Sequence, residues 1–172
     1  MSIVPTNINY NSTILRQNLN SLVRTFPFLN VQSVGLSVLR KNIYVIKLGK
    51  GTKKVFYFSS IHANEWITSV VLMKFVEDYA NAYVQNGKLY NYSVRDLFNN
   101  VSIFIMPMVN PDGVDLVTGN ILPSSSAYNQ AKSIANNYPD IPFPSGWKAN
   151  IRGVDLNLQF PARMGASQGN KI

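Results

Sequence analysis

The single histidine of this chain, His62, stands three residues before Glu65. Both follow an apolar, strand-like run at residues 54–59, in the order Ser-Ser-Ile-His-Ala-Asn-Glu-Trp. A spacing of three puts two side chains on the same side of a turn or helix start. An imidazole nitrogen and a carboxylate oxygen together form half of an ordinary zinc site, whose other ligands come from elsewhere. Taken alone, the pair fits a solvated loop histidine that has an acid nearby by chance better than it fits a metal site.

Two further segments carry polar side chains where chemistry could occur. The Asn-Pro-Asp-Gly run at residues 110–113 follows a nearly all-apolar stretch at 101–108, which predicts a tight turn at the end of a buried strand. Further along, Asp155 and Asn157 are two residues apart and share a face if the chain is extended there. An acid and an amide on one face suit the orientation of a metal ligand and contact with a substrate. An ordinary turn and an amphipathic edge strand are the alternatives.

Helices and strands are expected to alternate around these segments. Apolar residues spaced four, three and four apart predict an amphipathic helix over 11–26, capped by residue 11 or 12. Runs at 42–48 and 54–59 predict two strands, joined by a hairpin turn at 49–52. The remaining expected elements are a long helix over 64–85, a short one beginning at Ser93, the strand at 101–108 and a helix over 127–136. This order predicts an α/β fold with a mixed sheet flanked by helices.

Composition narrows the class of protein. The chain has 172 residues, 46% of them apolar and 14% charged, which suits one globular domain. It contains no cysteine, which excludes disulfide scaffolds, cysteine-ligated metals and thiol nucleophiles. The net charge of +8 favours anionic partners. Charge alone leaves nucleic acid open, but the basic residues are scattered without a run of five or six, so nucleic acid is not the partner we expect.

The sequence also bears on location. No stretch approaches the roughly 20 apolar residues that span a bilayer. The first 17 residues lack a charged segment followed by an apolar one, so they do not resemble a signal peptide. We therefore expect a cytoplasmic protein without membrane association.

Taken together and in this order, the three segments resemble the zinc carboxypeptidase family. That family has a His-x-x-Glu half-site after a strand, then an Asn-Pro-Asp-Gly turn, then a Gly-Val-Asp-Leu-Asn-Arg-Asn-Phe run. All three are present here, the last as Gly-Val-Asp-Leu-Asn-Leu-Gln-Phe-Pro at 153–161. The resemblance extends from Tyr10 to about Ala162 and implies a carboxypeptidase-like fold truncated on its C-terminal side.

The segment at residues 153–161 indicates which branch of the family this chain resembles. Digestive carboxypeptidases have Asn-Arg there, whereas in this chain Asn157 is followed by Leu158. With Trp-Lys-Ala-Asn at 147–150 upstream, the pattern looks like that of the bacterial γ-D-glutamyl-diamino acid endopeptidases. Those enzymes hydrolyse γ-glutamyl bonds in peptidoglycan stem peptides, so the resemblance implies such a peptide as the substrate.

The resemblance also implies roles for individual residues. His62 and Glu65 would be the first two ligands of Zn²⁺, and Asp155 would fix the tautomer of His62 through its other ring nitrogen. Lys148 would polarise the scissile carbonyl. Asn157, together with Arg152, would contact a substrate carboxylate.

Two groups that the family requires are missing from this chain. The third zinc ligand is a histidine and the general base a glutamate, both downstream of the last segment, and the chain has no second histidine. Catalytic zinc normally has three protein ligands and a water molecule. We therefore expect an incomplete zinc site and a truncated, inactive copy of the peptidase. The alternative is a non-catalytic basic module that binds cell-wall fragments or another polyanion.

Two expectations concern the end of the chain and its surface. After Ala162 the family pattern predicts Gly-Trp, but the chain continues Arg-Met-Gly, and a one-base shift of the codons would restore the tryptophan. We interpret residues 1–172 as one incomplete catalytic domain and 163–172 as a frameshifted tail. Truncation would also leave an uncovered sheet edge through which copies of the chain could associate.

Overall fold

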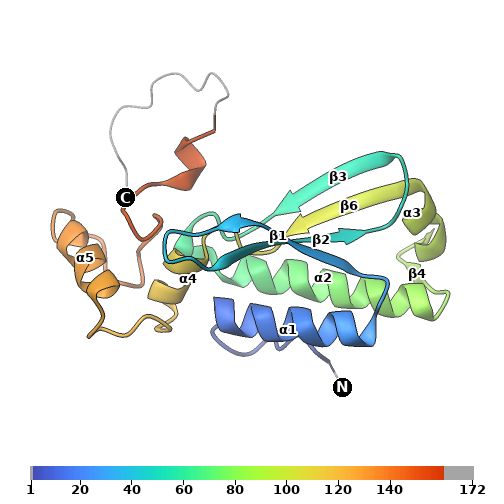
Figure 1. The fold of residues 1–172 in the computed structure, drawn as a ribbon, viewed down its shortest axis with the longest axis horizontal. Coiled ribbons are helices and arrows are strands. Elements are labelled where there is room, and N and C mark those ends of the chain that lie inside the picture. The colour runs from blue at the N-terminus through green and yellow to red at the C-terminus, as the bar shows by residue number, and fades with distance from the viewer. Residues whose placement is uncertain (1, 161–172) are drawn as a thin grey trace.

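The computed structural model describes residues 2–160, which form a mixed sheet with helices (Figure 1). The helices are α1 (Ser12–Thr25), α2 (Ile67–Val84), α3 (Val94–Asn100), α4 (Pro111–Val117) and α5 (Ser126–Ala135), with 3₁₀ turns η1 (Ala63–Glu65) and η2 (Leu156–Leu158). The strands are β1 (Asn30–Leu36), β2 (Asn42–Leu48), β3 (Lys53–Phe58), β4 (Lys88–Leu89), β5 (Tyr92–Ser93) and β6 (Val101–Met106). The predicted α/β fold with a mixed sheet is confirmed.

The main sheet has the strand order β1-β2-β6-β3. β1 pairs with β2 and β2 with β6 in antiparallel fashion, whereas β3 and β6 run parallel. Because β3 and β6 are parallel neighbours, both carboxyl ends lie at the same edge of the sheet. The loops that carry the Ser-Ser-Ile-His and Asn-Pro-Asp-Gly segments begin there.

The hairpin predicted at residues 49–52 is wrong, because β6 lies between β2 and β3. The connection packs against the start of β6: Lys50 N donates to Phe98 O at 2.8 Å. Gly49 has φ +89°, and a Cβ atom there would stand 2.0 Å from Val101 O. Glycine is required at this position by close backbone approach rather than by a two-strand turn.

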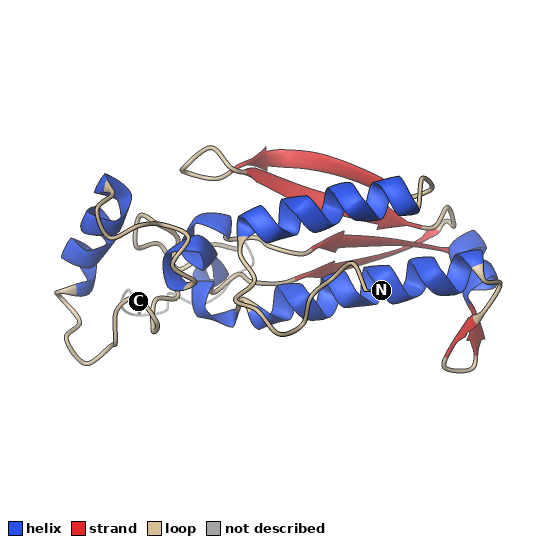
Figure 2. Cartoon of the chain, turned by 90° about the horizontal axis from the view of Figure 1, so that it is seen from below, coloured by secondary structure: helices blue, strands red, loops and turns tan. Residues whose placement is uncertain are grey.

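The hydrophobic core lies between the sheet and the two long helices. Helices α1 and α2 run side by side along one face of the sheet (Figures 1 and 2). Leu19 and Leu22 of α1 and Met73 of α2 are buried in one cluster with Ile46 and Ile105 of the sheet. Helices α4 and α5 gather beyond the carboxyl ends of β3 and β6 (Figure 1). Helix α4 therefore lies next to the loops that begin at those strand ends.

Three further differences separate the structure from the sequence expectations. The Asn-Pro-Asp-Gly segment begins a helix, α4, with Asn110 as its N-cap instead of forming a simple turn. The segment around Asp155 and Asn157 is not extended but turns through η2. Strand β1 had no clear sequence pattern, since six of its seven residues are exposed. The proposed frameshifted tail, 163–172, lies outside the described residues.

Candidate metal site

The loop after β3 is held in place by bonds that continue the β3–β6 pairing. Ser59 N donates to Met106 O at 3.1 Å, and Val109 N and Asn110 N donate to Ser59 O and Ser60 O at 3.0 and 3.1 Å. The chain then turns through Ser60, whose backbone adopts the left-handed conformation at φ 49°. His62 follows as the residue before η1. Its position is therefore fixed by the strand ends and not by a free loop.

His62 lies between two carboxylates. Its Nδ1 atom is 3.0 Å from Glu65 Oε1, and its Nε2 atom is 3.3 Å from Asp155 Oδ1. The second contact has ion-pair distance without hydrogen-bond geometry, so Nε2 has no hydrogen-bond partner among the described residues. The side chains of His62 and Asp155 are 19% and 14% exposed, and that of Glu65 is 52% exposed. The structure thus brings together three residues that the sequence separates by up to 93 positions.

This arrangement gives the two ring nitrogens different surroundings. Nδ1 and the Glu65 carboxylate contact each other, and both residues line the same cavity. Asp155 lies on the side of the opposite nitrogen, Nε2, in a less exposed position and without hydrogen-bond geometry, whereas Nδ1 is within hydrogen-bond distance of Glu65. Glu65 and Asp155 supply two negative charges beside a single imidazole, which favours a bound cation.

Asp155 reaches His62 because the segment before it is tied to the β3 loop. Ala63 N donates to Lys148 O at 2.9 Å. The Asn150 carboxamide oxygen accepts from Arg152 N and Val154 N at 2.9 and 3.1 Å, which closes a turn. Asp155 then caps η2 by accepting from Asn157 N at 2.9 Å. The family resemblance predicted Asp155 beside His62, and the chain brings the two residues within 3.3 Å through a turn and not through an extended strand.

Asn110 joins the three segments of the site. Its side-chain nitrogen donates to Ile61 O at 3.2 Å and to Ala149 O at 3.0 Å, while its side-chain oxygen accepts from Gly113 N at 3.0 Å. Asn110 is only 2% exposed. A Cβ atom at Gly113 would stand 2.8 Å from Ala63 Cβ and 2.7 Å from Ala149 O, so only glycine permits this packing. The Asn-Pro-Asp-Gly segment therefore holds the His62 loop against the segment at Ala149.

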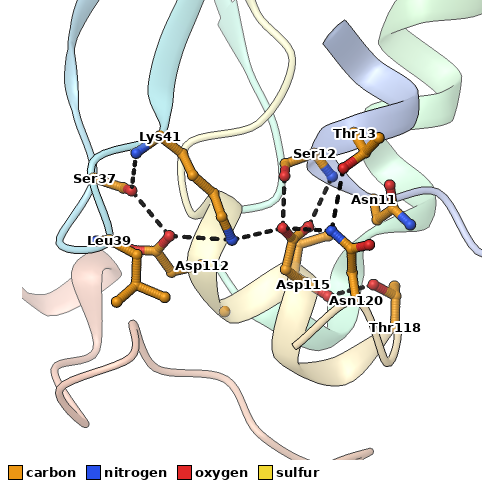
Figure 3. Close-up of polar contacts among 12 residues, drawn as sticks. Asn11, Ser12, Thr13, Ser37, Leu39, Lys41, Asp112, Asp115, Thr118 and Asn120 are labelled. Carbon is orange, nitrogen blue, oxygen red and sulfur yellow. Dashed lines mark hydrogen bonds and ion pairs between the residues drawn. The ribbon is translucent and has the colours of Figure 1, made fainter. Parts of the chain in front are cut away.

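Sequence reasoning missed the two acids of α4. Asp112 accepts from Ser37 Oγ and Leu39 N, both at 2.9 Å. Asp115, which is fully buried, accepts from Ser12 N at 2.8 Å and from Lys41 Nζ at 2.6 Å (Figure 3). These bonds connect α4 to the start of α1 and to the β1–β2 turn. The two acids fix the position of α4 and do not contact His62.

A cavity of about 320 Å³ opens at the carboxyl ends of the strands. His62, Glu65 and Asn157 line it, together with Phe58, Ser59, Ser60, Ile61 and Thr68. Lys148 and Arg152 are exposed and do not line it. Within residues 2–160, no three histidine, cysteine or acidic residues form a group that could hold a metal ion. Among the described residues, the imidazole of His62 and the carboxylate of Glu65 are thus a pair of groups of the kind that bind a metal ion.

Comparison with known proteins shows similarity to zinc carboxypeptidases. The zinc carboxypeptidase family profile matches residues 15–172. The chain is 41% identical over 155 residues to γ-D-glutamyl-L-diamino acid endopeptidase 1 of Lysinibacillus sphaericus. The aligned region covers 90% of this chain and 38% of that protein. It is 36% identical to the uncharacterized protein YqgT of Bacillus subtilis, over 89% of this chain and 40% of the other.

The fold also matches a solved structure. Bovine thrombin-activatable fibrinolysis inhibitor, crystallised with a tick carboxypeptidase inhibitor, superposes with a TM-score of 0.55 at 20% identity. The match covers 82% of this chain and 36% of that one. The chain thus spans about two fifths of the length of the relatives it matches. None of the helices described within residues 2–160 has the length and apolar character needed to span a membrane.

Proposed function

The chain belongs to the zinc carboxypeptidase family, and from this premise we propose that His62 and Glu65 are zinc ligands and that Asp155 orients His62. The observation that carries the proposal is the position of one imidazole between two carboxylates, with Nδ1 toward Glu65 and Nε2 toward Asp155. The donor set fits zinc, which binds imidazole nitrogen and carboxylate oxygen. When bound in a complete site, zinc supplies Lewis-acid polarisation and lowers the pKa of a bound water.

The substrate that we propose is a peptide with a γ-D-glutamyl-diamino acid bond, as found in peptidoglycan. This rests on the 41% identity to an endopeptidase of that name. Asn157 lines the cavity beside His62, which supports our assignment of this residue to a substrate contact. Arg152 and Lys148 are exposed cations on the segment that ends at Asp155, and we assign them to a substrate carboxylate and to the scissile carbonyl, respectively.

We propose further that the 172-residue chain is an inactive form of the peptidase. It has one histidine in all, and His62 and Glu65 are one ligand fewer than a catalytic zinc site uses. A glutamate general base is also lacking near His62, since Glu65 is already assigned to the metal, and such a base contributes about 10²–10⁴ in rate. Zinc binding by the isolated chain should therefore be weak, and hydrolysis of a γ-D-glutamyl-diaminopimelate peptide should be absent.

Zinc titration against a competing chromophoric chelator tests the ligands. His62→Ala and Glu65→Gln should each abolish binding, and Asp155→Asn should weaken it roughly 10- to 100-fold, the usual range for a residue that orients a metal ligand. Asp96→Asn, which removes an exposed acid in the first turn of α3, is the matched control and should bind as the parent chain does. Equal zinc affinity of the parent and His62→Ala proteins would refute the assignment.

A peptidase assay tests the second part of the proposal. The parent chain is incubated with a γ-D-glutamyl-diaminopimelate peptide and excess zinc, and products are separated by mass. No cleavage is expected. Turnover by the parent chain that is lost in His62→Ala would show that the site is complete without a further ligand, and it would overturn the inactive form while leaving the ligand assignment intact.

A further inference from the structure

Much of the positive charge of the chain lies away from His62. Arg16 and Arg24 are on α1, and Arg40 is in the turn between β1 and β2. None of the three lies within ion-pair distance of an acid in the described residues. Since residues 161–172 contain no aspartate or glutamate, all eight acidic side chains of the protein are described. These arginines are thus available to an external anion.

The arginines border two adjoining cavities. One, of about 320 Å³, is lined by Arg16, Arg40 and Lys41 with Thr13 and Tyr44 among its other residues. The other, of about 430 Å³, lies between α1 and the β1–β2 pair and is lined by Arg16, Arg24, Leu19, Asn20, Val23, Val31 and Tyr44. Arg16 and Tyr44 line both cavities. Neither cavity shares a residue with the one at His62.

Asp115 also lines the first cavity, and Lys41 Nζ lies 2.6 Å from it and 3.4 Å from Asp112. Asp115 accepts from Ser12 N, Ser12 Oγ, Lys41 Nζ and Asn120 Nδ2, at 2.6 to 2.9 Å (Figure 3). Four donors satisfy the accepting capacity of one carboxylate. Lys41 is therefore shared between two carboxylates and Asp115 binds the first turn of α1, which leaves Arg16 and Arg40 as the cations of this cavity that pair with no acid among the described residues.

The turn that carries Arg40 is fixed in a strained form. Arg40 has φ 63°, a left-handed conformation that is unfavourable for a residue with a Cβ atom. The turn is closed by Ser37 N donating to Lys41 O at 2.8 Å and by Arg40 N donating to Ser37 O at 3.0 Å. Leu39 N is held by Asp112. The Arg40 backbone is therefore held on the rim of the cavity by bonds on both sides.

From these features we propose that the two cavities form a binding site for a small organic phosphate. The first cavity is rich in donors and free positive charge, and a phosphate group presents acceptor oxygens in every direction to such donors. The second offers Leu19, Val23 and Val31 to an apolar group attached to the phosphate. Arg16, at the junction, contacts the ester end of the phosphate. This site is independent of the zinc proposal.

Phosphate binding is tested by NMR titration of the intact chain with phenyl phosphate, inorganic phosphate and phenol. Phenyl phosphate should bind saturably and several-fold more tightly than inorganic phosphate, and phenol should not bind. The double variant Arg16→Gln/Arg40→Gln should lose about tenfold or more in affinity for phenyl phosphate, the loss of two charge-assisted contacts. Lys88→Gln/Arg95→Gln removes the same charge from the region of β4 and α3 and should bind as the parent chain does.

The apolar half of the site has its own test. Val23→Asn should reduce the affinity for phenyl phosphate to that for inorganic phosphate and leave the latter unchanged. Equal losses in the two double variants would show that only net charge matters, and this would overturn the site. Equal affinity of the parent chain for phenyl phosphate and inorganic phosphate, or no saturable binding of either, would overturn it as well.

Discussion

Replacing Asn110 by alanine should unfold the region around His62 at a much lower denaturant concentration than in the parent chain. The side chain makes three hydrogen bonds, to Ile61 O, Ala149 O and Gly113 N, and it is 2% exposed. A hydrogen bond contributes about 1 kcal/mol net, and buried groups that lose a partner cost at least as much. The sum is about 3 kcal/mol of unfolding free energy.

The size of this effect makes it measurable by ordinary methods. A loss of about 3 kcal/mol changes the folding equilibrium constant more than 100-fold. For a domain of this length, it lowers the melting temperature by roughly 6–12 °C. Urea unfolding followed by circular dichroism gives the free energy, and the ¹⁵N shifts of the His62 imidazole report whether its surroundings change.

Asn110→Asp separates the two roles of this side chain. Aspartate keeps the oxygen that caps α4 and is an equally good N-cap residue. It loses the N–H₂ group, however, and turns a carboxylate oxygen toward the carbonyls of Ile61 and Ala149. We therefore expect Asn110→Asp to be at least as destabilised as Asn110→Ala. If the free energy of unfolding of Asn110→Asp is within about 0.5 kcal/mol of that of the parent chain, helix capping alone explains Asn110, and the inference that this residue holds the His62 loop is wrong.

Two other predictions concern the N-terminus and the open edge of the sheet. Burial alone would raise the pKa of Glu77, but hydrogen bonds from Ile3 N, Ser2 Oγ and Lys74 outweigh it and lower that pKa. The stability that this lowered pKa contributes is present above about pH 4.3, the pKa of glutamate in an unfolded chain, and is lost as the pH falls through the folded pKa. Glu77→Gln should therefore lower the free energy of unfolding by about 1–3 kcal/mol at pH 7. In urea unfolding at several pH values, the variant should lose less stability on acidification than the parent chain. The outer edge of β3 has no partner strand among residues 2–160, and Phe56 on this strand is 49% exposed. We therefore expect the chain to self-associate through this edge, and light scattering should show that Phe56→Lys reduces the association. The control Val34→Lys, on β1 at the opposite edge, should associate as the parent chain does; a parent chain that stays monomeric would contradict this prediction.

Much of the local structure is predictable from the sequence because its determinants are a few residues apart. Asn11 accepts from Ile14 N at 3.0 Å and begins α1 as the capping pattern predicts. Ser93 accepts from Asp96 N at 3.3 Å and begins α3 in the same way. In both cases one side chain satisfies a backbone donor in the first helical turn, and this requires no knowledge of the rest of the fold.

Strand order is not predictable in this way, because its determinants are distant in sequence. The hairpin at residues 49–52 fails since β6, which begins at Val101, pairs with both β2 and β3. Sequence neighbours often pair, but a parallel β3–β6 contact requires a crossover through α2 and α3. The local signs of this were Gly49 and Gly51, where a Cβ atom would stand 2.0 Å from the Val101 carbonyl oxygen and 1.8 Å from the carbonyl carbon of Asn100, respectively.

The candidate site combines both situations. The spacing of His62 and Glu65 is local, and the 3.0 Å contact between them follows from the turn at η1. Asp155 approaches His62 through non-local bonds, from Ala63 N to Lys148 O and from Asn110 to Ala149 O, which neither residue type nor spacing specifies. The association of Asp155 with His62 could therefore be inferred from family resemblance but not from the pattern around either residue. Because Asn110 holds both segments, a change there should affect the orientation of His62 even though Asn110 does not touch it.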